Sequence, residues 1–161
     1  FTCEFKGKNV LQSHQKDITS FLDNADLMGQ VLGILKIAQE KGVCLDPHIK
    51  NFVTDSDGKV YYVDFSPPCV EEYFSLRLSL CSEEKELMMQ NFEYLKPAKL
   101  GYHFAGDLMK TDDAFMARMP ELFKMMKERN IVNGDYEYFL SEANKIIKIE
   151  RERDKRGIFL L

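Results

Sequence analysis

The amino-acid sequence predicts an α+β fold that is mostly α-helical and contains one β-hairpin. Apolar residues recur at helical spacing over three long stretches, residues 17–41, 82–95 and 136–153. Two runs rich in β-branched and aromatic residues flank an Asp-Ser-Asp-Gly turn at residues 55–58. No internal repeat, low-complexity tract or long linker divides the sequence, so we expect a single domain over residues 1–161.

The first long helix is expected to run from Asp17 to Lys41. Asp17 is a suitable N-cap because its carboxylate can accept hydrogen bonds from the first backbone amides, and Gly42 is a suitable stop. The apolar stripe is broad, which predicts a central and mostly buried helix. Gly29 and Gly33 lower the helix propensity of this stretch, and we expect them to let a neighbouring backbone approach closely.

The helices after the hairpin follow from capping and proline signals. Ser82 should cap a helix that Pro97 ends, and Pro120 should either kink a helix or begin one. The last helix should run over residues 136–153, and its charged end, residues 150–156, is expected to be a solvated, salt-bridged face.

Residues 98–111 fit no single pattern. His103 and Asp107 within this stretch could share one face of a helix. We interpret them as a packed or surface pair rather than as a functional one.

The hairpin is expected to pair residues 51–54 with residues 59–64 across the Asp-Gly turn. Back-to-back pairing of these strands puts Asn51 and Asp64 at the same open end. Residues 1–16, before the first helix, include the sequence Lys6-Gly7-Lys8 and are expected to be a hinge or linker remnant.

The composition is that of one globular domain, with 45% hydrophobic and 30% charged residues. The net charge of −4 and the lack of a basic patch argue against a nucleic-acid partner. No apolar run approaches membrane-spanning length, so we expect no membrane partner. Four cysteines with no C-x-x-C spacing favour free thiols in a cytoplasmic protein, and three scattered histidines show no zinc-ligand spacing.

Three polar residues around the hairpin have the order that phosphoryl transfer requires. Asp46 and Asn51 lie in one loop, and Asp64 lies where the second strand ends. Phosphoryl transfer needs a carboxylate beside the attacking hydroxyl and hard oxygen ligands for a nucleotide-bound Mg²⁺. Asp46 would be the carboxylate that faces the acceptor, and Asn51 and Asp64 would be the metal ligands.

The segment from Cys44 to Pro68 resembles the catalytic core of a protein-kinase-like fold, and most closely the aminoglycoside phosphotransferase and choline kinase branch. His48, two residues after Asp46, is typical of that small-molecule branch, whereas protein kinases usually carry a lysine at this position. The resemblance implies a kinase-like C-terminal lobe with a catalytic-loop hairpin, in which His48 or Lys50 supports the loop or contacts phosphate.

The resemblance further implies an enzyme that uses ATP and Mg²⁺ to phosphorylate a hydroxyl of a small-molecule acceptor. No Gly-rich loop and no strand lysine of the kinase type precedes Asp46. We therefore expect the chain to be a fragment, with its N-terminal lobe elsewhere in a longer chain or in a partner chain. The alternative function is a non-catalytic, pseudokinase-like domain that acts through a partner.

Two simpler interpretations of these residues stay open. Asp46-Pro47 can form a turn where the preceding helix ends, and Asp64 can cap the end of a strand. The hairpin turn also has the Asp-x-Asp-Gly start of a calcium loop, but it lacks the later acidic ligands of such a loop.

Overall fold

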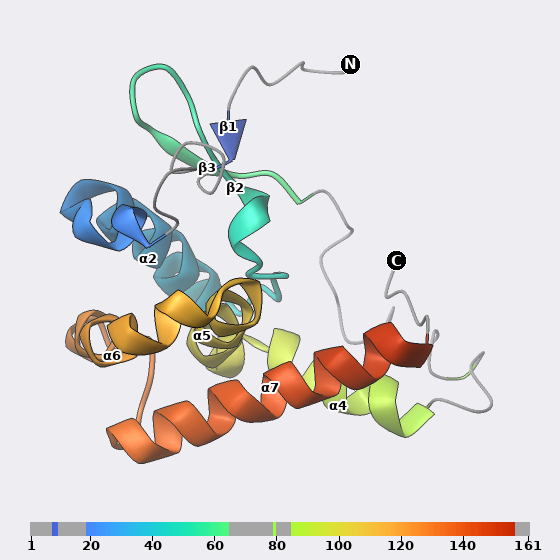
Figure 1. The fold of residues 1–161 in the computed structure, drawn as a ribbon. Helices are drawn as coiled ribbons and strands as arrows, with labels where there is room; N and C mark the ends of the chain where they lie inside the picture. Colours follow the sequence, from blue (N-terminus) through green and yellow to red (C-terminus); the bar gives the residue numbers. More distant parts are fainter. Residues whose placement is uncertain (1–7, 10–18, 65–78, 80–84, 157–161) are drawn as a thin grey trace, which may run out of the picture.

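The computed structural model describes residues 8–9, 19–64, 79 and 85–156 (Figure 1). The described chain is mostly helical with one small sheet, which confirms the α+β class that the sequence predicts. Its elements in chain order are β1 (Lys8–Asn9), the 3-10 helix η1 (Ser20–Asp23), α2 (Ala25–Lys41), η2 (Ile49–Asn51), β2 (Phe52–Thr54), β3 (Val60–Tyr62), α4 (Lys85–Leu95), η3 (Pro97–Lys99), α5 (Leu100–Thr111), η4 (Asp113–Arg118), α6 (Met119–Glu128) and α7 (Tyr136–Arg156).

The sheet is antiparallel in the order β1-β2-β3. β2 and β3 pair with Phe52 opposite Tyr62, and the turn between them closes through the Asp55 carboxylate, which accepts from the backbone N–H of Asp57 and of Lys59. Gly58 completes the turn with φ of 78°, a left-handed conformation that glycine adopts without strain. The hairpin is therefore a local product of its turn residues, and Asp55 serves the turn itself.

Two details of the sheet differ from the expectation. Asn51 lies in η2 rather than in the strand, because its backbone N–H donates to the His48 carbonyl and closes a 3-10 turn. Lys8 and Asn9, expected in a linker, pair with Thr54 and Val53 of β2. The rest of the expected linker and residues 65–78 lie outside the described residues.

Helix α2 begins later than Asp17, which itself lies outside the described residues. Asn24 is the N-cap: its side chain accepts from the Leu27 backbone N–H at 3.0 Å, and its extended backbone separates α2 from η1. The helix ends as expected, with Gly42 left-handed at φ of 68°. Gly29 and Gly33 do not mark a close backbone approach, because a Cβ on Gly33 would meet nothing within 4 Å and one on Gly29 only an arginine side chain at 3.9 Å.

Helices α5 and α7 form the centre of the helical part, and α5 has the small sheet on one side and α7 on the other (Figure 1). The two helices approach closely at Gly106, where a Cβ would lie 2.9 Å from the Ala143 carbonyl oxygen. The stretch that fitted no pattern is thus a helix, α5, that is buried over nearly its whole length. Its residues face neighbours on all sides, so no amphipathic stripe appears in the sequence.

Most of the buried apolar side chains form one continuous cluster that links β2 and β3 with the α-helices. Phe52 of β2 packs edge-to-face against Phe104 of α5 at a centroid distance of 5.9 Å, and Phe21 of η1 packs against Phe115 of η4 at 5.7 Å. The core thereby fixes the hairpin and the loop before it against α5.

The remaining helices agree with the sequence except at their ends. Pro120 lies in the first turn of α6, so it begins a helix, and α4 ends at Leu95 just before Pro97. The expected cap of α4, Ser82, lies outside the described residues. Helix α7 continues to Arg156, and its charged end is not uniformly solvated, because Glu150 is fully buried.

Candidate functional site

The loop between α2 and β2 holds Asp46 by its backbone. The Asp46 N–H donates to the Tyr62 hydroxyl at 3.1 Å, and the Asp46 carbonyl accepts from the Asn51 side-chain amide at 3.0 Å. The Tyr62 hydroxyl also lies 3.0 Å from that carbonyl and 3.3 Å from Asp64 Oδ2, so its single proton serves one of the two. Tyr62 therefore links the loop to the end of the hairpin.

Asn51 and Asp64 lie at the open end of the hairpin. The Val63 N–H donates to the Asn51 carbonyl at 2.9 Å, which places Asn51 beside the residue before Asp64. Burial and the nearby carboxylates of Asp64 and Asp46 raise the pKa of Tyr62 well above its ordinary value, so the phenol stays protonated as a donor. The three polar residues predicted from the sequence are thus linked through the Asp46 carbonyl, which faces both the Asn51 amide and the Tyr62 hydroxyl that reaches Asp64.

His48 faces a carboxylate with each ring nitrogen. Its Nδ1 contacts Asp107 Oδ1, while its Nε2 lies 3.3 Å from Glu150 Oε1 and 3.5 Å from Asp46 Oδ1. The second oxygen of Asp107 accepts the Ile49 backbone N–H at 2.8 Å. Asp107 of α5 therefore fixes both the imidazole and the backbone of the loop that carries Asp46.

Glu150 of α7 joins two histidines, the buried His103 and the partly buried His48. Its Oε1 lies 3.1 Å from His103 Nε2 as well as 3.3 Å from His48 Nε2, and the two rings stand edge-to-face at 5.6 Å. His103 Nδ1 lies 3.2 Å from the Tyr94 carbonyl of α4. Lys110 Nζ lies 3.2 Å from Glu150 Oε2 as an ion pair without hydrogen-bond geometry. We name Asp46, His48, His103, Asp107 and Glu150 the histidine cluster.

The charges of the histidine cluster shift two pKa values in opposite directions. Burial lowers the pKa of His48, but hydrogen bonds to Asp107 and Glu150 and the charge of Asp46 outweigh burial and raise it to about 10. Burial alone would raise the pKa of Glu150, yet hydrogen bonds from His103 and His48 hold it well below its ordinary value. The structure thus stabilises an imidazolium among carboxylates.

Two of the predicted residues differ from the rest of the site in their surroundings. Lys50 is exposed on η2, outside the histidine cluster. Cys44, two residues before Asp46, is half-buried. The other three cysteines lie outside the described residues, so the expectation of free thiols stays a prediction.

Sequence reasoning missed Tyr62, His103, Asp107 and Glu150. Of the two alternatives for His103 and Asp107, a packed or a surface pair, the packed one is confirmed, because they are 2% and 5% exposed. The sequence did not indicate their partners, which are the loop of Asp46 for Asp107 and helix α7 for His103. A signal for Glu150 was present, since it follows Ile146 and Ile147 by four and three residues and so continues their inward stripe.

Two sets of side chains in this region have the chemistry to hold a cation. Asn51 and Asp64 offer an amide and a carboxylate oxygen at the hairpin end. Asp46, His48 and His103 each offer one ligand atom, and these three atoms lie within 4.8 Å of one another. The first set suits a hard cation such as Mg²⁺, whereas the second adds imidazole nitrogen.

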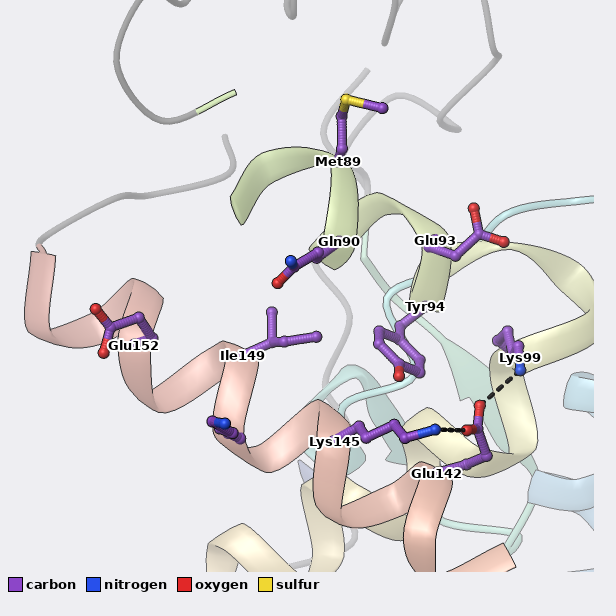
Figure 2. Close-up of a pocket in the computed structure, with 10 residues that line it drawn as sticks. Met89, Gln90, Glu93, Tyr94, Lys99, Glu142, Lys145, Ile149 and Glu152 are labelled. Carbon is purple, nitrogen blue, oxygen red and sulfur yellow. Dashed lines mark hydrogen bonds and ion pairs between the residues drawn. The ribbon is translucent and has the colours of Figure 1, made fainter. Parts of the chain in front are cut away.

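A separate hollow of about 740 Å³ lies between α4 and α7 (Figure 2). Its polar wall is Glu142, whose two oxygens each accept from a lysine at 2.6 Å, Lys99 on one side and Lys145 on the other. The Tyr94 ring lines this hollow, while the Tyr94 carbonyl faces His103. The two regions therefore share α4 and α7 but no ionisable side chain.

Comparison of the chain with protein-family models, with curated proteins and with solved structures finds no match. Among the described residues, no helix is both long enough and apolar enough to cross a membrane. The case for a function therefore rests on the chemistry of the site.

Proposed function

We propose that this chain carries the catalytic loop and the metal-binding hairpin of a kinase-like, ATP- and Mg²⁺-dependent phosphotransferase that acts on a small-molecule hydroxyl. The observation that carries the proposal is the convergence of Asp46, Asn51 and Asp64 through the base of one hairpin and the Tyr62 hydroxyl. This is the arrangement expected for the C-terminal lobe of the aminoglycoside phosphotransferase and choline kinase branch.

The donor set at the hairpin end fits Mg²⁺. Asn51 Nδ2 is used by the Asp46 carbonyl, which leaves the amide oxygen to act as a ligand, and Asp64 supplies a carboxylate. Mg²⁺ keeps several waters and phosphate oxygens, so two protein oxygens are sufficient. Bound there with ATP, the ion would neutralise the charge on the phosphates.

Asp46 would orient the acceptor hydroxyl and accept its proton as the new oxygen–phosphorus bond forms. Its side chain is 36% exposed, so an acceptor can reach it, and its backbone is held on both sides by Tyr62. His48 and Asp107 would position this loop rather than contact phosphate, because both nitrogens of His48 face carboxylates.

The alternative, a non-catalytic binding domain, is favoured by one feature of Asp46. Its Oδ1 is closed off from solvent and accepts no hydrogen bond from the described residues, so only part of this carboxylate faces outward. In that case the scaffold would serve a protein partner, and Mg²⁺ would add nothing to nucleotide binding.

The acceptor, the ATP and a cytoplasmic location belong to the same proposal. The sequence before Asp46 has no Gly-rich loop to cover the phosphates. We therefore expect a further lobe, from a longer chain or a partner chain, to be required for tight binding of ATP.

Calorimetry of Mg²⁺-ATP binding tests the proposal on the longest open reading frame that contains this chain. Asp64→Ala should weaken the Mg²⁺-dependent binding by roughly tenfold or more. Asp57→Ala is the matched control, because Asp57 is an exposed carboxylate in the turn of the same hairpin. Binding without Mg²⁺ dependence, or equal effects of the two variants, would contradict the proposed metal site.

A further inference from the structure

The histidine cluster has more hydrogen-bond acceptors than its imidazoles can satisfy. His103 Nδ1 faces a carbonyl, which only accepts, so a neutral His103 must place its proton there and turn the Nε2 lone pair toward Glu150 Oε1 at 3.1 Å. His48 likewise faces carboxylate oxygens with both nitrogens. Two neutral imidazoles supply one N–H each, so two positive charges are required at the two Nε2 atoms.

We propose that one divalent transition-metal ion of the Zn²⁺ class supplies these charges, bound by His48 Nε2, His103 Nε2, Glu150 Oε1 and Asp46 Oδ1. A single ion of charge +2 replaces two separate protons. It would also balance the carboxylates of Asp46, Asp107 and Glu150, of which only Glu150 has a lysine partner among the described residues, Lys110.

Three of the separations between these atoms are close to those of a four-coordinate site, and the ligand atoms of Asp46, His48 and His103 lie within 4.8 Å of one another. Zn²⁺ bonds to nitrogen and oxygen at about 2.0–2.2 Å, so neighbouring ligand atoms of a tetrahedral site lie about 3.3 Å apart. The structure has 3.1 Å for His103 to Glu150, 3.3 Å for His48 to Glu150 and 3.5 Å for His48 to Asp46. Asp46 is the partly exposed member, so its side chain provides the route by which an ion enters.

The surroundings of both histidines are those of metal ligands. Imidazoles that bind a metal usually donate their other N–H to a carboxylate or a backbone carbonyl, which fixes the ring and its tautomer. Here His48 Nδ1 contacts Asp107, and His103 Nδ1 faces the Tyr94 carbonyl. Each Nε2 is thereby aimed at the same buried carboxylate oxygen from a different direction.

An unsatisfied buried oxygen supports the same assignment. Asp46 Oδ1 is shielded from solvent and accepts no hydrogen bond from the described residues, although a buried carboxylate oxygen is costly to leave without a partner. Coordination would satisfy this atom. The site is distinct from the oxygen-only pair of Asn51 and Asp64, and its mixture of imidazole and carboxylate favours Zn²⁺ or Co²⁺ over Mg²⁺.

Cobalt titration of the chelator-treated full chain tests this inference without any enzymatic readout. Four-coordinate Co²⁺ absorbs visible light far more strongly than six-coordinate Co²⁺ in water. We expect wild-type protein to develop this absorption up to one equivalent, and Zn²⁺ to abolish it by displacement. Glu150→Gln and His103→Gln should each weaken Co²⁺ binding by roughly 100-fold and remove the absorption.

Glu142→Gln is the matched control, because Glu142 is also a buried glutamate of α7 within an ionic cluster. It should bind Co²⁺ like the wild type, and so should Asp64→Asn. Circular dichroism shows whether each variant is folded. If the buried variants do not fold, Asp46→Asn decides, since this side chain is partly exposed and should weaken binding by roughly tenfold.

A weak, six-coordinate spectrum for wild-type protein would overturn the inference, as would equal losses in Glu142→Gln and Glu150→Gln. The inference shares Asp46 with the proposed phosphoryl transfer, but the two are tested at different residues. Loss of Mg²⁺-ATP binding in Asp64→Ala tests the hairpin end alone, and the Co²⁺ spectrum tests the histidine cluster alone.

Discussion

Helix α7 carries two buried glutamates, Glu142 and Glu150, whose surroundings differ. Glu142 is covered by its partners, because each of its oxygens accepts from one lysine and the stems of Lys99 and Lys145 close over it near the surface (Figure 2). Glu150, eight residues or about 12 Å further along the helix, is 0% exposed and offers one oxygen to two imidazoles.

The comparison of Glu142 with Glu150 distinguishes a structural ion pair from a candidate functional site. The two oxygens of Glu142 are satisfied by flexible lysines that retain contact with water, so the arrangement is complete. Around Glu150 the acceptors outnumber the N–H groups, and Glu150 Oε2 and Asp46 Oδ1 accept no hydrogen bond from the described residues. This deficit in a buried region is the observation on which the proposed metal site rests.

The largest effect should come from Glu150→Gln. The amide removes a buried negative charge beside His48 and Lys110 and leaves the two imidazoles with only a neutral oxygen as their shared acceptor. We expect the free energy of unfolding to fall by about 3–5 kcal/mol. Urea denaturation in the presence of a chelator at neutral pH measures this decrease in stability. A decrease no larger than that of Glu142→Gln would contradict the difference drawn between the two glutamates.

Asp107→Asn should have the next largest effect. Asp107 accepts the Ile49 backbone N–H and contacts His48, and the amide can replace only one of these two acceptors. We expect a loss of about 2–3 kcal/mol, because one buried donor is left without a partner. Hydrogen exchange at the Ile49 amide should quicken in the same variant; an unchanged exchange rate would show that Asp107 does not hold this loop.

Glu142→Gln should cost only about 1 kcal/mol, since Lys99 and Lys145 are 25% and 57% exposed and can turn to water. Burial raises the pKa of Glu142, but hydrogen bonds from Lys145 and Lys99 outweigh burial and lower it below its ordinary 4.5. Its contribution is therefore present above pH 4.5 and is lost as the pH falls. The stability difference from wild type should shrink on acidification, and a difference that grows would contradict this assignment.

Gly33 lies away from Glu142 and from the histidine cluster. Gly33→Ala therefore gives the size of the stability change expected for a substitution that touches neither region. A Cβ there meets nothing within 4 Å, so alanine should stabilise α2 by roughly 0.5–1 kcal/mol through helix propensity. The thermal midpoint should rise slightly. A decrease would mean that Gly33 has a neighbour which the described residues do not include.

Local signals predicted the parts of the fold that depend on neighbouring residues. The Asp-Gly turn fixes the hairpin, Gly42 ends α2, and Pro120 begins α6, and each acts within a few residues. The predicted start of α2 at Asp17 is wrong, because Asn24 is the N-cap of the helix. Asp17 and Asn24 are both suitable capping residues, and the sequence contains both.

The candidate site was only partly predictable for a physical reason. Asp46, Asn51 and Asp64 are near in sequence, so their spacing indicates their chemistry. His48 meets Asp107 across 59 residues, and His103 meets Glu150 across 47. Such contacts leave no mark in a local pattern, and the charged residues after Ile149 were interpreted as solvated although Glu150 continues the inward stripe.

The most direct measurement of the central claim is water-proton relaxation with Mn²⁺ replacing Mg²⁺, because Mn²⁺ takes the same oxygen ligands. For the longest reading frame that contains this chain, we expect enhanced relaxation that depends on ATP. The enhancement should disappear in Asn51→Ala and in Asp64→Ala and persist in Asp57→Ala. No ATP-dependent enhancement, or an equal enhancement in all four proteins, would contradict a nucleotide-bound metal at the end of the hairpin.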